Sequence, residues 1–157
     1  MTENLYNVMI GQKNVQFVVT KANADFGGSQ INKYWDAKQD DDVRVVASLG
    51  QLRYLSFMSQ VECVLGNSSS GIVEAPFLGI PVVNIGNRQK GRLRCESILD
   101  VRLDESEILE ALQKAINFPD DELSKVVPPL GLGNTSQKII ELIKTMDFKK
   151  KAPFYDL

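Results

Sequence analysis

The sequence predicts an α/β fold in which a parallel β-sheet carries helices on both faces. Short apolar runs alternate with amphipathic segments along most of the chain, and this alternation favours a parallel sheet. Turns rich in glycine, serine and asparagine follow several of the apolar runs, as expected for loops between strands and helices. With 157 residues, of which 43% are hydrophobic and 24% charged, the chain is expected to form one soluble globular domain.

Composition excludes several classes of function. The formal net charge of −2 predicts no broad attraction to nucleic acid or membranes. No apolar run approaches the roughly 20 residues of a membrane span, and the sequence shows no signal-peptide pattern, so we expect a cytoplasmic protein. Cys63 and Cys95 lack metal-ligand spacing and are expected to be reduced thiols. The sequence contains no histidine, which excludes Ser-His-Asp chemistry and His-ligated metal within this chain; we expect neither a metal nor a cofactor.

The elements follow from the hydrophobic periodicity. Apolar, β-branched runs predict strands over 15–20, 43–47, 61–65, 80–85 and 97–101. Apolar residues at helical spacing predict helices over 3–11, 31–35, 49–58, 72–78 and 105–117. Prolines and glycines between 119 and 133 predict an irregular connection, after which Asn134-Thr135-Ser136 is expected to cap a last helix. Residues 147–157 form a basic and aromatic C-terminal tail of the single domain 1–157.

The stretch 66–71, Gly-Asn-Ser-Ser-Ser-Gly, joins a predicted strand to a predicted helix. Unpaired N–H groups and the positive end of the helix dipole make such a helix start a site for a phosphate or another anion. The hydroxyls of residues 68–70 add donors, and Glu74 could accept hydrogen bonds from a sugar diol. The alternative is a structural one, a serine N-cap with small residues at a helix–sheet contact.

Three loops are expected at the carboxyl edge of the strands, where ligands bind in parallel sheets. Loop 21–28 offers Asn23 and Asp25, and loop 66–71 offers hydroxyls and amides. Loop 86–94 offers four basic side chains: Arg88, Lys90, Arg92 and Arg94. Their convergence predicts a site for a nucleotide or nucleotide sugar, although a basic loop that is merely solvated stays an alternative.

Segments 66–76 and 79–92 closely resemble the hydrolysing UDP-N-acetylglucosamine 2-epimerases. Asn23-Ala24-Asp25 with Gly27-Gly28 looks like a second motif of that family, and by this resemblance Asn23 would line the nucleotide site. The match runs from about Thr2 to Ser136. It looks closest to the branch that makes sialic acid precursors or related bacterial nonulosonates for capsule polysaccharides.

The resemblance implies one half of a two-domain fold of the GT-B type, with two Rossmann-like domains. This chain resembles only the C-terminal, UDP-binding domain. Ser68 and Ser69 with the amide of Gly71 would hold the diphosphate. Glu74 would bind the ribose hydroxyls, and Arg88 would bind near the ribose and phosphates. The implied ligand is UDP or a UDP-N-acetylhexosamine.

The family reaction eliminates UDP and then hydrates the sugar to its free 2-epimer, which requires a base near C2 and an acid at the departing phosphate. By the resemblance, these acidic residues lie in an N-terminal domain, and a diphosphate-binding histidine lies in a strand preceding this chain. The chain is therefore expected to be inactive alone, to need that N-terminal domain as partner, and to self-associate into a homo-oligomer through an exposed sheet edge.

Two other functions stay open at this point. A nucleotide-sugar domain of a GT-B glycosyltransferase would share the phosphate-binding loop and the ribose carboxylate, although the loop Asn87–Arg92 favours the epimerase. A catalytically dead interaction module would bind no nucleotide.

Overall fold

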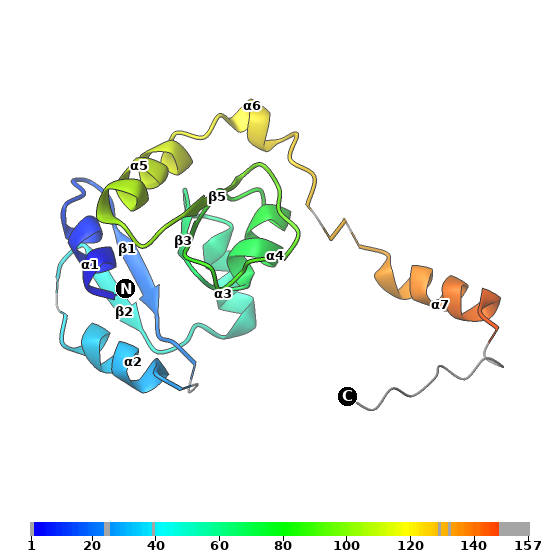
Figure 1. The fold of residues 1–157 in the computed structure, drawn as a ribbon, viewed down its shortest axis with the longest axis horizontal. Helices are drawn as coiled ribbons and strands as arrows, with labels where there is room; N and C mark the ends of the chain where they lie inside the picture. Colours follow the sequence, from blue (N-terminus) through cyan, green and yellow to red (C-terminus); the bar gives the residue numbers. More distant parts are fainter. Residues whose placement is uncertain (1, 24–25, 39, 129, 132, 148–157) are drawn as a thin grey trace.

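The computed structural model describes residues 2–23, 26–38, 40–128, 130–131 and 133–147. Within them the strands are β1 Phe17–Thr20, β2 Val43–Val46, β3 Val64–Gly66, β4 Val82–Ile85 and β5 Ile98–Val101. Every pairing between these strands is parallel, which confirms the predicted α/β class. The strands form two sheets, β1-β2 and β3-β4-β5, which lie side by side in Figure 1.

The helices of the described part are α1 Thr2–Ile10, α2 Gly28–Asp36, α3 Gly50–Met58, α4 Ser70–Phe77, α5 Glu105–Ile116, α6 Asp120–Leu123 and α7 Thr135–Thr145. The single turn of α6 was not predicted, because its sequence Asp-Asp-Glu-Leu has no apolar periodicity. The predicted side-chain cap of α7 is wrong. Asn134 occupies the N-cap position in a left-handed conformation, with φ 60°, and its side chain makes no capping hydrogen bond.

The core lies on both faces of β4, whose residues are all buried. Val83 and Ile85 pack with Ile108 of α5 on one face. Val82 packs with Ile72 of α4 on the other face. Because successive strand residues point to opposite faces, one short apolar run supplies both layers and holds the start of α4 in place.

The β1-β2 sheet is covered by α1 and α2. Met9 of α1, Trp35 of α2 and Val43 of β2 are buried together. The Tyr6 and Trp35 rings meet edge to face, with their centroids 6.3 Å apart, a favourable aromatic geometry. The first sheet therefore has an apolar core of its own on this face.

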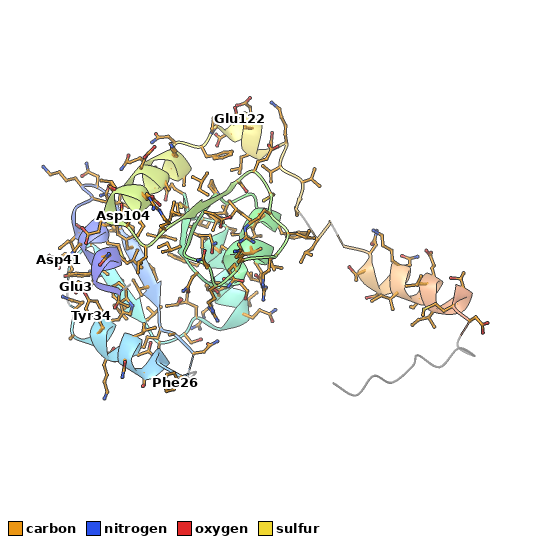
Figure 2. All side chains as sticks on the ribbon, viewed as in Figure 1. Glu3, Phe26, Tyr34, Asp41, Asp104 and Glu122 are labelled. Carbon is orange, nitrogen blue, oxygen red and sulfur yellow. The ribbon has the colours of Figure 1, made fainter. Side chains whose placement is uncertain are left out.

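Asp104, which Figure 2 labels, lies directly before helix α5. Its carboxylate accepts hydrogen bonds from the backbone N–H groups of Ser106 at 3.0 Å and Glu107 at 3.1 Å, so Asp104 is an N-cap. The Ser106 hydroxyl and these N–H groups lower the pKa of the Asp104 carboxyl from its usual value. The cap fixes the start of the helix that covers β4.

Helix α7 lies apart from the rest of the described chain. Its side chains do not reach the body formed by α1 to α5 and the two sheets (Figures 1 and 2). None of its residues is buried. The predicted tail 147–157 lies outside the described residues except for Asp147. None of the helices among the described residues combines the length and the apolar composition that a membrane span requires.

Candidate functional site

The serine-rich loop leaves β3 at Gly66 and enters α4 at Ser70. Gly66 has φ 146°, a conformation that side chains rarely adopt. A Cβ on Gly71 would lie 3.0 Å from Cγ1 of Val82, so glycine lets the first turn of α4 approach the sheet closely. The structural alternative is thus confirmed for the small residue Gly71. For a serine cap the outcome is mixed. Ser69 holds the N-cap position without a side-chain capping bond, while the Ser68 hydroxyl accepts from the backbone N–H of Ser70 at 3.4 Å.

The hydroxyls and amides of this loop differ in what they can offer an anion. The Ser70 hydroxyl lies 2.7 Å from the Tyr54 hydroxyl and 3.0 Å from that of Ser68, so it is engaged within the protein. The side chains of Ser68 and Ser69 are exposed. The Gly71 N–H donates to the carbonyl of Ser68 at 3.2 Å, so it would reach an anion only by sharing or exchanging that bond.

Glu74 lies on the second turn of α4 and is half-buried. Its Oε2 atom is buried and has no hydrogen-bond partner among the described residues. An unpaired buried carboxylate oxygen is unfavourable, so a hydroxyl donor that reached Glu74 would relieve this cost.

Asn23 is exposed on the loop that follows β1. The Asn32 side chain brackets this loop, since its Oδ1 accepts from the N–H of Ala22 at 2.8 Å and its Nδ2 donates to the Ala22 carbonyl at 3.0 Å. A Cβ on Gly28 would lie only 2.0 Å from the Asn23 carbonyl oxygen, so only glycine fits where α2 meets the loop. Asn32 was not predicted, because nothing in the sequence around it indicates that its side chain bonds to this loop.

The loop after β4 is tied to the serine-rich loop through one carbonyl. Both Arg88, from Nη1 at 3.3 Å, and Gln89, from Nε2 at 2.8 Å, donate to the carbonyl oxygen of Asn67. Gln89 is only 3% exposed, so its side chain is a buried structural link between the two loops. Arg88 is exposed. This link between the loops was not predicted.

Arg94 turns inward, unlike the solvated loop cation that the sequence suggests. Its Nε donates to Oδ2 of Asp100 at 3.0 Å, and its Nη2 donates to the Gln89 carbonyl at 2.8 Å. Buried Asn84 donates to the other oxygen of Asp100 at 2.6 Å. Arg94 therefore links loop 86–94 to β5 and, through Asp100, to β4. Its guanidinium group is already hydrogen-bonded within the protein.

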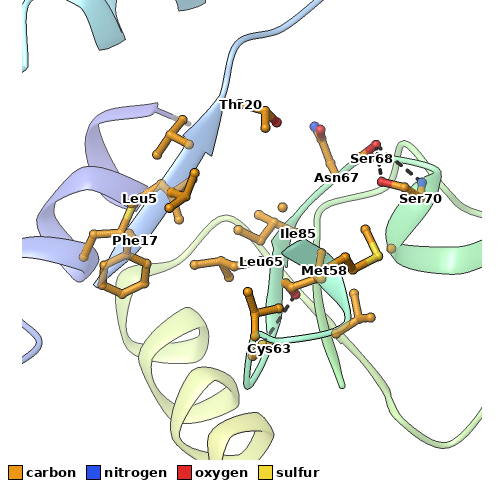
Figure 3. Close-up of a pocket in the computed structure, with 18 of the residues that line it drawn as sticks. Leu5, Phe17, Thr20, Met58, Cys63, Leu65, Asn67, Ser68, Ser70 and Ile85 are labelled. Atoms are coloured by element: carbon orange, nitrogen blue, oxygen red, sulfur yellow. Dashed lines mark hydrogen bonds between the residues drawn. The ribbon is translucent and has the colours of Figure 1, made fainter. Parts of the chain in front are cut away.

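A cavity of about 1270 Å³ lies between β1 and β3 and opens beneath these loops. Figure 3 shows Thr20, Asn67 and Ser68 along its polar rim, and Phe17 and Leu65 in its apolar interior. Asn23, Ser68, Gly71 and Arg88 all line it. Its volume exceeds the 300–1,000 Å³ of typical small-ligand pockets.

The structure thus places four of the six predicted site residues around one cavity. The other two, Ser69 and Glu74, lie on the same turn and helix as Ser68 and Gly71 but outside the cavity wall. Asp25 lies outside the described residues. Among the described residues, no group of three or more acidic, cysteine or histidine side chains could hold a metal ion.

Comparison with known proteins identifies one family. The family model described as UDP-N-acetylglucosamine 2-epimerase matches residues 2–144.

Two curated relatives share this description in part. A GDP/UDP-N,N'-diacetylbacillosamine 2-epimerase (hydrolyzing) of Campylobacter jejuni is 43% identical over 96 residues, covering 59% of this chain and 25% of the relative. A UDP-N,N'-diacetylbacillosamine 2-epimerase (hydrolyzing) of Legionella pneumophila is 34% identical over 134 residues, covering 85% of this chain and 35% of the relative. The chain therefore spans only about a quarter to a third of the length of these relatives.

Among solved structures, the UDP-GlcNAc 2-epimerase of Methanocaldococcus jannaschii, in complex with UDP-GlcNAc and UDP, has a TM-score of 0.69. It is 15% identical, and the similarity covers 90% of this chain and 39% of that one. The shared fold confirms the Rossmann-like architecture predicted from the sequence.

Proposed function

Because this chain belongs to the UDP-N-acetylglucosamine 2-epimerase family, we propose that it is the UDP-sugar-binding part of a hydrolysing 2-epimerase. In this proposal the polar rim of the cavity between β1 and β3 binds UDP or a UDP-N-acetylhexosamine. The complete enzyme would eliminate UDP and release the 2-epimeric sugar.

One observation carries the proposal: Asn23, Ser68 and Arg88 come from three separate loops and line a single cavity. These loops follow β1, β3 and β4, all at the carboxyl edge of parallel strands, where α/β folds bind their ligands. The start of α4 adds the N-terminal end of a helix dipole, which favours phosphate.

Each residue type suits one part of UDP. The exposed hydroxyls of Ser68 and Ser69 can donate to phosphate oxygens, and Arg88 supplies a charged, forked donor for the same group. Glu74 has the unpaired carboxylate oxygen that a ribose diol would satisfy. Asn23, on the loop after β1, would line the nucleotide site from the other side of the cavity.

These residues bind and position the leaving group and supply no base for the sugar. In the proposal, the acid and base come from a further domain, so the isolated chain binds UDP without turning over its sugar conjugate.

Calorimetric titration of UDP tests this assignment. Glu74→Ala, Ser68→Ala/Ser69→Ala and Arg88→Ala should each weaken binding by about 10- to 100-fold, the loss expected for about 1.5–3 kcal/mol of hydrogen bonding to a charged group. Lys138→Ala, which removes an exposed cation from α7, is the matched control and should bind like the wild type.

Equal affinity of all variants would place UDP elsewhere. Failure of the wild-type chain to bind UDP would contradict the proposal that this rim is a sufficient nucleotide site.

A further inference from the structure

Three side-chain hydroxyl groups are linked from helix α3 to the serine-rich loop, and we refer to Tyr54, Ser70 and Ser68 as the hydroxyl network. The Tyr54 hydroxyl lies 2.7 Å from the Ser70 hydroxyl, and the Ser70 hydroxyl donates to Oγ of Ser68 at 3.0 Å. Figure 3 draws the contacts between Ser68 and Ser70 as dashed lines. All three residues line the cavity between β1 and β3. Tyr54 is thus coupled to Ser68 although it belongs to another element.

The directions of these hydrogen bonds follow from the number of protons. A serine hydroxyl has one proton to donate and two lone pairs that accept. Because Ser70 donates its proton to Ser68, Tyr54 is the donor and Ser70 the acceptor in the 2.7 Å contact. The hydroxyl network therefore runs in one direction, from the phenol through Ser70 to Ser68.

Ser68 is left as a donor toward a ligand. Its Oγ accepts from the Ser70 hydroxyl and, at 3.4 Å, from the Ser70 backbone N–H, so both of its lone pairs are used. Its own proton remains, and the side chain is exposed. Hydrogen bonds linked in series polarise one another, which strengthens Ser68 as a donor. Such a hydroxyl favours an acceptor, such as a phosphate oxygen, over a second donor.

Apolar packing holds the phenol ring in place. Tyr54 lies one turn before Met58 on α3, and residues four apart share a helix face. Both side chains belong to the apolar cluster that contains Ile72 of α4 and Val82 of β4. The half-buried ring of Tyr54 is therefore anchored in the core, while its hydroxyl reaches the loop.

We propose that Tyr54 is a positioning residue, which acts through Ser70 to orient the Ser68 hydroxyl as a donor to the ligand. The inference rests on the proposed function, in which that ligand is the diphosphate of UDP. Tyr54 itself does not contact the nucleotide in this arrangement, so its effect is confined to the phosphate end.

Titration of Tyr54→Phe, which removes only the phenolic oxygen, tests this role. We expect UDP to bind about three- to tenfold more weakly than to the wild type, as for the loss of one hydrogen bond. Uridine, which has no phosphate, should bind both chains within about a factor of two. Because Glu74 of α4 would bind the ribose, a displaced α4 would weaken uridine as well. Equal losses for uridine and UDP would overturn the proposal, since a general structural role would then explain them.

The middle of the hydroxyl network supplies a second test. Ser70→Ala interrupts the network, so Tyr54→Phe added to that variant should weaken UDP binding by less than about a further twofold. If Tyr54→Phe cost as much in the Ser70→Ala variant as in the wild type, Tyr54 would act by another route and the proposal would be wrong.

Tyr34→Phe is the matched control for Tyr54→Phe. Tyr34 lies on α2, away from the serine-rich loop, and its buried phenolic oxygen has no hydrogen-bond partner among the described residues. This variant loses the same atom from the other sheet's core and should bind UDP like the wild type. A loss equal to that of Tyr54→Phe would overturn the proposal.

A third measurement uses no nucleotide. NMR at low temperature follows the exchange of the Tyr54 hydroxyl proton with water, which should be about tenfold faster in Ser70→Ala than in the wild type, because the acceptor is removed. Equal exchange in both chains would overturn the proposal whether or not UDP binds. Faster exchange in Ser70→Ala, together with a wild type that binds no UDP, would support the hydroxyl network and contradict only the proposed function.

Discussion

The fold strongly changes the chemistry of Cys63. It lines the cavity beside β3, and burial raises the pKa of its thiol to about 12. We expect Cys63 in the Cys95→Ser variant to react with iodoacetamide at pH 8 about 10³-fold more slowly than in urea, because the thiolate is the nucleophile. Native and unfolded rates that agree within a factor of ten would contradict this burial.

The same shift affects stability at high pH. The folded thiol stays protonated above the pH at which the unfolded thiol ionises. The contribution of Cys63 to the free energy of unfolding is therefore complete below about pH 9 and is lost as the pH rises toward 12. This loss is the reason to measure the labelling at pH 8, where the fold is unaffected.

At the scale of single residues, the sequence indicated candidate binding residues but not the side chains that hold the binding loops in place. Ser68 and Arg88 could be proposed from their types and their loops. Asn32 and Gln89 could not, because their role depends on the carbonyls of Ala22 and Asn67, which come near them only in the folded chain.

At the scale of elements, Arg94 holds loop 86–94 to the sheet. Arg94→Ala removes the ion pair with Asp100 and the bond to the Gln89 carbonyl. Asp100 is half exposed, so we expect the free energy of unfolding to fall by only about 1–2 kcal/mol. Urea denaturation measures this change.

Arg92→Ala is the matched control for Arg94→Ala. Arg92 belongs to the same loop but its side chain is exposed, so its removal should change stability by less than about 0.5 kcal/mol. Similar losses in both variants would show that loop charge, rather than the Arg94 brace, stabilises this region.

Apart from the single turn of α6, the order of the elements was predictable because each strand and helix keeps its own hydrophobic period. The division into two sheets was not predictable from periodicity. Val18 and Leu65 have the sequence character of ordinary strand residues, and periodicity does not show that, among the described residues, β1 pairs with β2 alone and β3 with β4 alone.

At the scale of the whole molecule, stability is concentrated in the body formed by α1 to α5 and the two sheets. Helix α7 contributes no buried residue, whereas Ile108 of α5 is fully buried against β4. A chain that ends before Asn134 should therefore unfold with a free energy within about 0.5 kcal/mol of the full chain.

Ile108→Ala should lower the free energy of unfolding by about 2–5 kcal/mol, because it leaves a cavity in the core. Urea denaturation of the three chains measures both effects. If loss of α7 proved as damaging as Ile108→Ala, the apolar residues Ile139, Ile140 and Ile143 would have to pack on the body in solution, and the separation of α7 in Figure 1 would be contradicted.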